Sequence, residues 1–128
     1  MDPNTLRFAR SHEWVHFEDG TATVGISDFA VRELTDLVYI ELPDVGRQVA
    51  VGDSLGEVES VKAVSDLYAP VGGEVVAVND ALQNDLTLLS EDAFGAGWIV
   101  KIRADDPSAT VELMDYGAYQ KFCESESA

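Results

Sequence analysis

Basic residues are scarce in this chain of 128 residues. Eight lysines and arginines stand against 24 aspartates and glutamates, which gives a formal net charge of −16. Such an acidic surface repels phosphate backbones and anionic lipid headgroups, so nucleic acid and membrane are excluded as partners. It favours proteins with basic docking surfaces, although the same excess of carboxylates also simply keeps a protein in solution.

Cysteine is almost absent, and long apolar runs are missing. Cys123 is the only cysteine, so no internal disulfide can form and a reducing compartment is expected. No stretch has the length of a signal peptide or of a membrane span. We therefore expect a cytoplasmic protein, or one of the mitochondrial matrix if this is a mature organellar form. The length predicts a single domain over residues 1–128.

Short alternating apolar runs are what the chain does contain, and they predict a mainly β fold. HEWVHFEDGTATVGI has the pattern of two strands around Asp19-Gly20, and VYIELP has that of a strand stopped by Pro43. Further strands are expected near residues 47–51, 54–61, 64–69, 73–78 and 98–103. Two helices are expected at the margins, a short one over residues 28–36 and a C-terminal one opened by Asp115.

An internal repeat occupies the middle of the sequence. GRQVAVGDSL (46–55) aligns with GEVVAVNDAL (73–82) at an offset of 27 residues. Each copy has the pattern of a strand, a turn and a second apolar segment. Two copies predict a quasi-twofold β sandwich in which each half covers the apolar face of the other. Between them, EVESVKAVSD lies in a predicted hairpin over about 54–69, with Lys62 exposed at its tip.

The residues around this hairpin resemble a known family. GEVESVKAVSDLYAPVGGEVVAVN resembles a lipoyl-attachment domain, which implies the barrel-sandwich hybrid form of the β sandwich. Within that class, ESVKA followed by SD and GGEV resembles the H proteins of the glycine cleavage system. Further matching segments follow in the order of that family: SHEW (11–14), VGISDFA (24–30), VYIELP (38–43), GWIVKI (97–102) and YQKFCESE (119–126). The resemblance therefore covers nearly the whole chain.

This resemblance implies a carrier protein and no complete enzyme. Lipoic acid would be amide-linked to Lys62, and a lipoate-attaching enzyme would recognise the hairpin at Glu59, Ser60, Val61 and Ala63. A glycine decarboxylase with pyridoxal phosphate would load an aminomethyl group, which a tetrahydrofolate-dependent aminomethyltransferase would then use. Dihydrolipoamide dehydrogenase would reoxidise the arm. The carrier is expected to be a monomer.

The same resemblance implies a cleft into which the loaded arm folds. Ser11, Glu13 and Asp66 match positions that line this cleft in the family. Glu33 stands where many relatives have a histidine, so the role of that histidine does not carry over, but a further carboxylate suits a cationic arm. Carboxylates favour the protonated amine of the cargo and would protect it. Taken singly, these residues also fit the start of a strand or a solvated hairpin.

Other interpretations of Lys62 remain open at this level. It fits a solvated turn lysine, whereas a Schiff-base lysine needs a desolvating pocket that this acidic hairpin does not predict. Biotin carriers typically place methionines on both sides of the lysine, and here the neighbours are Val61 and Ala63. Two other functions also fit the sequence: a lipoate relay carrier for other lipoyl enzymes, and a non-catalytic acidic interaction module.

A zinc-peptidase pattern also occurs by chance. HEWVH, from His12 to His16, matches HExxH, which binds zinc only when a helix places both histidines on one face. The surrounding pattern is strand and turn, and in a strand the two histidines would lie roughly 13 Å apart. There is no third histidine. We therefore expect no metal site.

Overall fold

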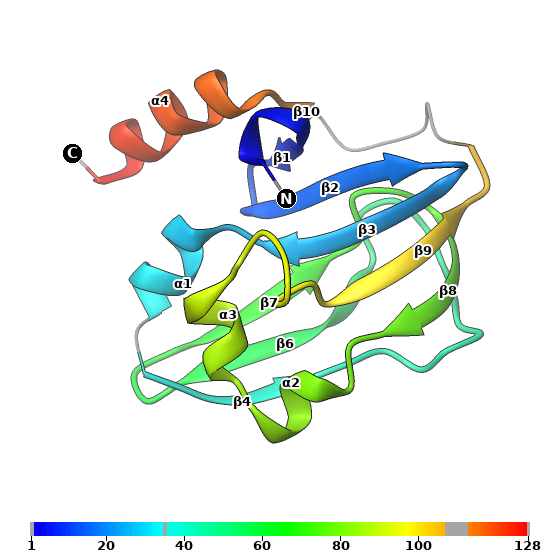
Figure 1. Cartoon of the computed structure of the whole chain (residues 1–128), viewed down its shortest axis with the longest axis horizontal. Helices are drawn as coiled ribbons and strands as arrows, with labels where there is room; N and C mark the ends of the chain where they lie inside the picture. Colours follow the sequence, from blue (N-terminus) through cyan, green and yellow to red (C-terminus); the bar gives the residue numbers. More distant parts are fainter. Residues whose placement is uncertain (1, 35, 107–112, 128) are drawn as a thin grey trace.

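Two antiparallel sheets dominate the computed structural model, which describes residues 2–34, 36–106 and 113–127 (Figure 1). Within these ranges, one sheet has seven strands in the order β10-β1-β2-β3-β9-β8-β5, and the other has three in the order β4-β6-β7. The predicted mainly β fold with a C-terminal helix is confirmed. No helix in the described ranges is long and apolar enough to cross a membrane.

The strands are short and the helices lie at the margins of the sheets. The large sheet contains β1 (Arg7–Ala9), β2 (Glu13–Glu18), β3 (Thr21–Ile26), β5 (Gln48–Val49), β8 (Gly73–Val78), β9 (Val100–Ala104) and β10 (Leu113–Met114). The small sheet contains β4 (Leu37–Glu41), β6 (Ser54–Ser60) and β7 (Val64–Tyr68). The helices are a 3-10 turn, η1 (Pro3–Thr5), and α1 (Asp28–Leu34), α2 (Ala81–Asn84), α3 (Thr87–Glu91) and α4 (Tyr116–Ser127).

The predicted hairpin around Asp19-Gly20 joins β2 to β3. Both turn residues have a positive φ, 50° for Asp19 and 79° for Gly20, as a two-residue type I′ turn requires. The helix that follows β3 is slightly shorter than predicted. Ser27 Oγ accepts the N–H of Ala30 at 3.1 Å and so caps α1, which ends at Leu34. Residue 35 of the predicted 28–36 span lies outside the described residues.

The two copies of the repeat pair with each other. Gln48 of β5 faces Glu74 of β8, and Val49 faces Gly73, in antiparallel register. The copies diverge after the shared turn, because the second apolar segment is strand β6 in the first copy and helix α2 in the second. Helices α2 and α3 were not predicted from the sequence pattern. Each of these short helices buries one leucine in the main core, Leu82 from α2 and Leu89 from α3.

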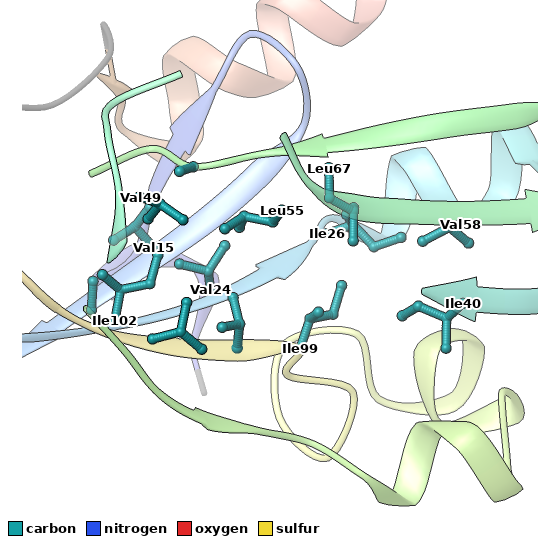
Figure 2. Packing of buried hydrophobic residues seen from close by; sticks show 14 of the residues in the cluster. Val15, Val24, Ile26, Ile40, Val49, Leu55, Val58, Leu67, Ile99 and Ile102 are labelled. Carbon is teal, nitrogen blue, oxygen red and sulfur yellow. The ribbon is translucent and has the colours of Figure 1, made fainter. Parts of the chain in front are cut away.

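The main core lies between the two sheets. Val24 and Ile102 from the large sheet and Val58 and Leu67 from the small sheet belong to one cluster of buried side chains that fills the space between the sheets (Figure 2). The alternation of buried and exposed residues along each strand therefore leaves one face of the small sheet open to solvent. That open face carries the acidic residues of the small sheet, which are Glu41, Glu57, Glu59 and Asp66.

A second core attaches the C-terminal helix to the first strands. Tyr119 and Cys123 of α4 are buried against Leu6, Phe8 and Trp14. The rings of Phe8 and Tyr119 are stacked with their centroids 4.4 Å apart. This contact fixes α4 over the start of the large sheet, on the same side of the molecule as α1 (Figure 1).

Candidate functional site

Lys62 is the middle residue of the three-residue loop, Val61 to Ala63, between β6 and β7. The loop is closed by Ser60, whose backbone N–H donates to the carbonyl of Ala63 at 2.8 Å. Val61 and Lys62 are exposed, and Val61 retains 75% of its accessible surface. The Lys62 amine therefore extends from a short, well-defined turn into solvent, where an enzyme can reach it.

Contacts beneath the loop hold it from two sides. The buried Ser60 hydroxyl accepts the N–H of Ala63 at 3.1 Å and lies 3.2 Å from the Ala63 carbonyl, to which it donates. The N–H of Val61 donates to the carbonyl of Asp36 at 3.1 Å, just before β4 begins. The loop is therefore anchored both to its own hairpin and to the neighbouring strand of the small sheet.

Removing the Ser60 hydroxyl should loosen this loop. We expect Ser60→Ala to leave the Ala63 N–H without its side-chain acceptor, at a cost of about 1 kcal/mol. Amide exchange of Ala63, followed by NMR, should then accelerate by roughly fivefold. Ser54→Ala, at the exposed start of β6, is the control and should leave this exchange unchanged. An unchanged Ala63 rate in Ser60→Ala would show that the hydroxyl does not order the loop.

The open face of the small sheet carries a row of carboxylates beside this loop. Glu41, Glu57 and Asp66 lie directly opposite one another on β4, β6 and β7. Partial burial, together with the surrounding carboxylates, raises the pKa of Glu57. Glu59, the residue predicted to take part in recognition, lies on the same strand between Tyr39 and Val64. Directly opposed like charges destabilise a sheet, so this row has an energetic cost.

A cleft of about 440 Å³ opens between the start of β2, α1, β7 and the end of α4. Its walls are partly apolar, and the apolar lining residues are Ile26, Phe29, Ala30, Leu34, Val58 and Leu67. Its polar lining residues are Ser11, His12, Glu13, Glu33, Ser65, Asp66 and Glu126. The structure thus brings together Ser11, Glu13, Glu33 and Asp66, which the sequence places on three separate segments.

Glu13 is the most deeply buried carboxylate of the cleft. Its side chain is 1% exposed, and it accepts hydrogen bonds from the Ser11 hydroxyl and, at 3.4 Å, from the N–H of Tyr68. Burial raises the pKa of Glu13 to about 7, although both hydrogen bonds oppose this shift. A cation entering the cleft would favour the carboxylate form. The geometry therefore suits the binding of an ammonium group.

Asp66 lies at the edge of the cleft on β7, and its side chain is exposed. The Tyr68 hydroxyl donates to its carboxylate at 3.3 Å, and the Asp66 carboxylate raises the pKa of Tyr68. Glu33 is also exposed, on the last turn of α1. Both carboxylates can therefore reach a cation without a large desolvation cost.

The two histidines of HEWVH point to different parts of the molecule. His12 lies in the turn before β2 and is not part of the strand, which corrects the sequence interpretation by one residue. It contacts Tyr119 and Glu126 of α4, whereas His16 on β2 lies 3.8 Å from Glu18. Among the residues that the structure describes, no group of three or more His, Cys, Asp or Glu side chains could hold a metal ion.

Sequence reasoning missed two kinds of cleft residue. The apolar wall, with Phe29 and Leu34 of α1, has the pattern of ordinary core. Glu126 gave no signal at all, because its contribution depends on where α4 packs. The complete cleft combines an apolar wall with four carboxylate side chains. This combination fits a flexible hydrocarbon and dithiolane arm that bears a cationic group, which is the chemistry of the predicted lipoyl arm.

Comparisons with known proteins agree on one family. A family model described as glycine cleavage H-protein matches residues 6–126. The chain is 56% identical over 128 residues to the glycine cleavage system H protein of Rhodopirellula baltica, covering 95% of each chain. It is 49% identical over 125 residues to that of Cronobacter sakazakii, covering 97% of each. The crystal structure of such a protein from Mycobacterium marinum superposes with a TM-score of 0.86 at 36% identity, covering 98% of this chain and 99% of that one.

Proposed function

Because this chain belongs to the glycine cleavage H-protein family, it is a lipoyl-carrying shuttle of the glycine cleavage system, and we propose that Lys62 carries the lipoyl group through an amide bond. The protein is a carrier component and not a catalyst. The observation that carries the assignment to Lys62 is its exposed position in the three-residue loop of the hairpin over residues 54–69. There the amine is accessible and its anchor is fixed.

The residues around Lys62 form the surface on which a lipoate-attaching enzyme acts. Ser60 sets the shape of the loop, and Val61 and Ala63 flank the lysine with small apolar side chains that leave it accessible. Glu59 adds a carboxylate two strand positions from the row described above. When attached, the lipoyl group supplies a dithiolane whose sulfur accepts and returns the one-carbon cargo.

The shuttle works with the other components of the glycine cleavage system. We propose that it meets them in turn: a pyridoxal-phosphate glycine decarboxylase that loads an aminomethyl group, a tetrahydrofolate-dependent aminomethyltransferase, and dihydrolipoamide dehydrogenase. The net charge of −16 supports brief electrostatic docking to basic surfaces. A single unit over residues 1–128, acting as a monomer in the cytoplasm, completes the proposal.

The cleft gives the arm a protected resting place. Glu13 and Asp66 would face the ammonium group of the cargo, with Ser11 orienting the Glu13 carboxylate through its hydroxyl. Glu33 adds charge at the rim. The apolar wall excludes water from the sulfur. In this arrangement the scaffold keeps the cargo amine protonated between encounters.

Lipoylation itself tests the assignment. With a lipoate ligase and lipoate, intact mass should rise by one lipoyl group, and peptide mapping should place it on Lys62. Lys121 on α4 and Lys101, whose amine lies 5.1 Å from the centre of the Trp98 ring, should stay free. Loss of one positive charge would take the formal charge from −16 to −17. A lipoyl group on either of the other two lysines would overturn the assignment.

A further inference from the structure

The C-terminal helix α4 forms one wall of the cleft described above, called the arm cleft from here on. Glu126, near the end of α4, lines the cleft together with Asp66 of β7 and Glu33 of α1. Its side chain is 43% exposed, so it faces both the cleft and solvent. Its Oε2 lies 2.9 Å from the Nε2 atom of His12, which also lines the cleft. The position of Glu126 is therefore defined by a specific contact.

A chain of hydrogen bonds extends from this contact into the protein. His12 Nδ1 lies 2.7 Å from the Tyr119 hydroxyl, which in turn contacts the hydroxyl of the buried Ser27. Burial raises the pKa of Tyr119, so the phenol stays protonated and can donate to His12. With Tyr119 donating to Nδ1, the Nε2–H of His12 is directed at Glu126. Because Ser27 also caps α1 at Ala30, the chain joins the β1–β2 turn, α1 and α4.

The backbone and the aromatic rings hold His12 in place. Its φ of 78° lies in the left-handed region, which a residue with a side chain adopts only when its surroundings impose it. Its N–H donates to the carbonyl of Ala9, and its carbonyl accepts the N–H of Ser27, both at 3.0 Å. The rings of Phe29 and Phe122 lie 5.2 Å and 5.9 Å from the imidazole. Few other orientations of this side chain are compatible with these contacts.

Charge explains what the cleft gains from Glu126. Four elements each contribute one carboxylate to the lining of the cleft: Glu13 from β2, Glu33 from α1, Asp66 from β7 and Glu126 from α4. The imidazole of His12 lines the same cleft. Such a cluster of like charges is unfavourable when empty of cations, and an ammonium group relieves the repulsion. Glu126 is the carboxylate that the C-terminal helix α4 brings to this cluster.

We propose that Glu126 binds the ammonium group borne on the arm, and that His12 and Tyr119 are the positioning residues that direct Glu126 into the cleft. The C-terminal helix thereby completes the cleft around the cargo. This inference rests on the proposed function, in which Lys62 carries the arm and Glu13 faces its cargo.

The test uses the unlipoylated full chain and methylammonium chloride as the probe. An NMR titration follows the amides of Glu13 and Tyr68, with sodium chloride at equal ionic strength as the reference. We expect Glu126→Gln to weaken methylammonium binding by about threefold, the range for a half-exposed ion pair. Glu124→Gln changes the same charge on the same helix, outside the cleft lining, and should bind as wild type does. Melting temperatures of the three proteins should agree.

A double-mutant cycle separates positioning from a general structural effect. Asparagine adopts the left-handed backbone readily, so His12→Asn should keep the turn and weaken methylammonium binding as much as Glu126→Gln does. The double variant should bind methylammonium only slightly more weakly than either single variant. The inference is overturned if the two single changes in binding free energy add fully in the double variant, or if Glu126→Gln and Glu124→Gln bind methylammonium equally well. If Glu13→Gln also binds methylammonium as wild type does, the cleft proposal itself fails; if it binds more weakly while Glu126→Gln does not, only the role of Glu126 fails.

Discussion

A Lys62→Arg protein is expected to fold normally and to carry no cargo at all. The guanidinium of arginine keeps the positive charge of the loop but cannot form the amide to lipoic acid. Because Lys62 is exposed, the substitution should change the free energy of unfolding by less than about 0.5 kcal/mol. In a reconstituted glycine cleavage system, glycine-dependent NADH formation should fall to the level seen without the carrier.

Lys121→Arg provides the matched control for this experiment. Lys121 is also exposed, on α4, and its replacement changes neither the net charge nor the arm cleft lining. This variant should support NADH formation at the wild-type rate. Carrier activity retained by Lys62→Arg, with its thermal unfolding unchanged, would show that the anchor of the arm lies elsewhere.

The second large effect is expected for Glu13→Gln, alone and combined with Asp66→Asn. The free amine of an aminomethyl group can expel the sulfur that holds it, and protonation of the amine blocks this route. A carboxylate about 4 Å away stabilises the ammonium by up to roughly 4 kcal/mol at an effective dielectric constant of 20. A third of that amounts to one pKa unit, or about tenfold less free amine. Spontaneous loss of cargo should therefore accelerate by about tenfold in Glu13→Gln.

The difference in cargo loss between wild type and Glu13→Gln is expected to depend on pH. At low pH the amine is protonated in both proteins, so cargo loss should be slow in both and the difference small. The pKa of Glu13 is about 7 in the empty cleft, and the cargo ammonium favours the carboxylate at lower pH. As pH rises toward the pKa of the free amine, the ionised Glu13 therefore protects the wild-type cargo, and the difference should grow. Ammonia release from the loaded proteins, measured from mildly acidic to mildly alkaline pH, follows this trend directly. Glu91→Gln on α3, outside the lining of the cleft, is the control. Equal release rates for wild type and Glu13→Gln at alkaline pH would refute the protective role.

Protein stability offers an independent check on the ionisation of Glu13. Its carboxyl has a pKa of about 7 in the folded chain and an ordinary value of 4.5, so the folded state binds the proton more tightly. Between these two values, rising pH removes stability, on the order of 3 kcal/mol in all. Glu13→Gln should show a flatter stability profile than wild type over this interval. Parallel profiles in urea unfolding would contradict the burial effect at Glu13.

Local patterns predicted most of the strands, including the β6–β7 hairpin, because they depend on neighbours in the sequence, whereas the very short strands β1 and β10 were not predicted. Asp19-Gly20 specifies its turn by backbone preference alone, and the alternation of β6 and β7 fixes which side chains face the core. The short helices α2 and α3 were missed because four or five residues carry too little periodicity. The resemblance brought Glu13 and Asp66 into one predicted cleft, whereas Glu126 joined it only through the packing of α4.

The anchoring of the loop to β4 has a consequence for the use of this protein as a tag. The Val61 N–H depends on the Asp36 carbonyl, and β6 pairs with β4 as well as with β7. A synthetic peptide covering residues 54–69 would lack that third strand, and isolated two-stranded hairpins are marginally stable in water. If Lys62 is the acceptor that we propose, we therefore expect the attaching enzyme to need the folded small sheet, and a minimal substrate to include at least the residues from Asp36 onward together with the core that supports them.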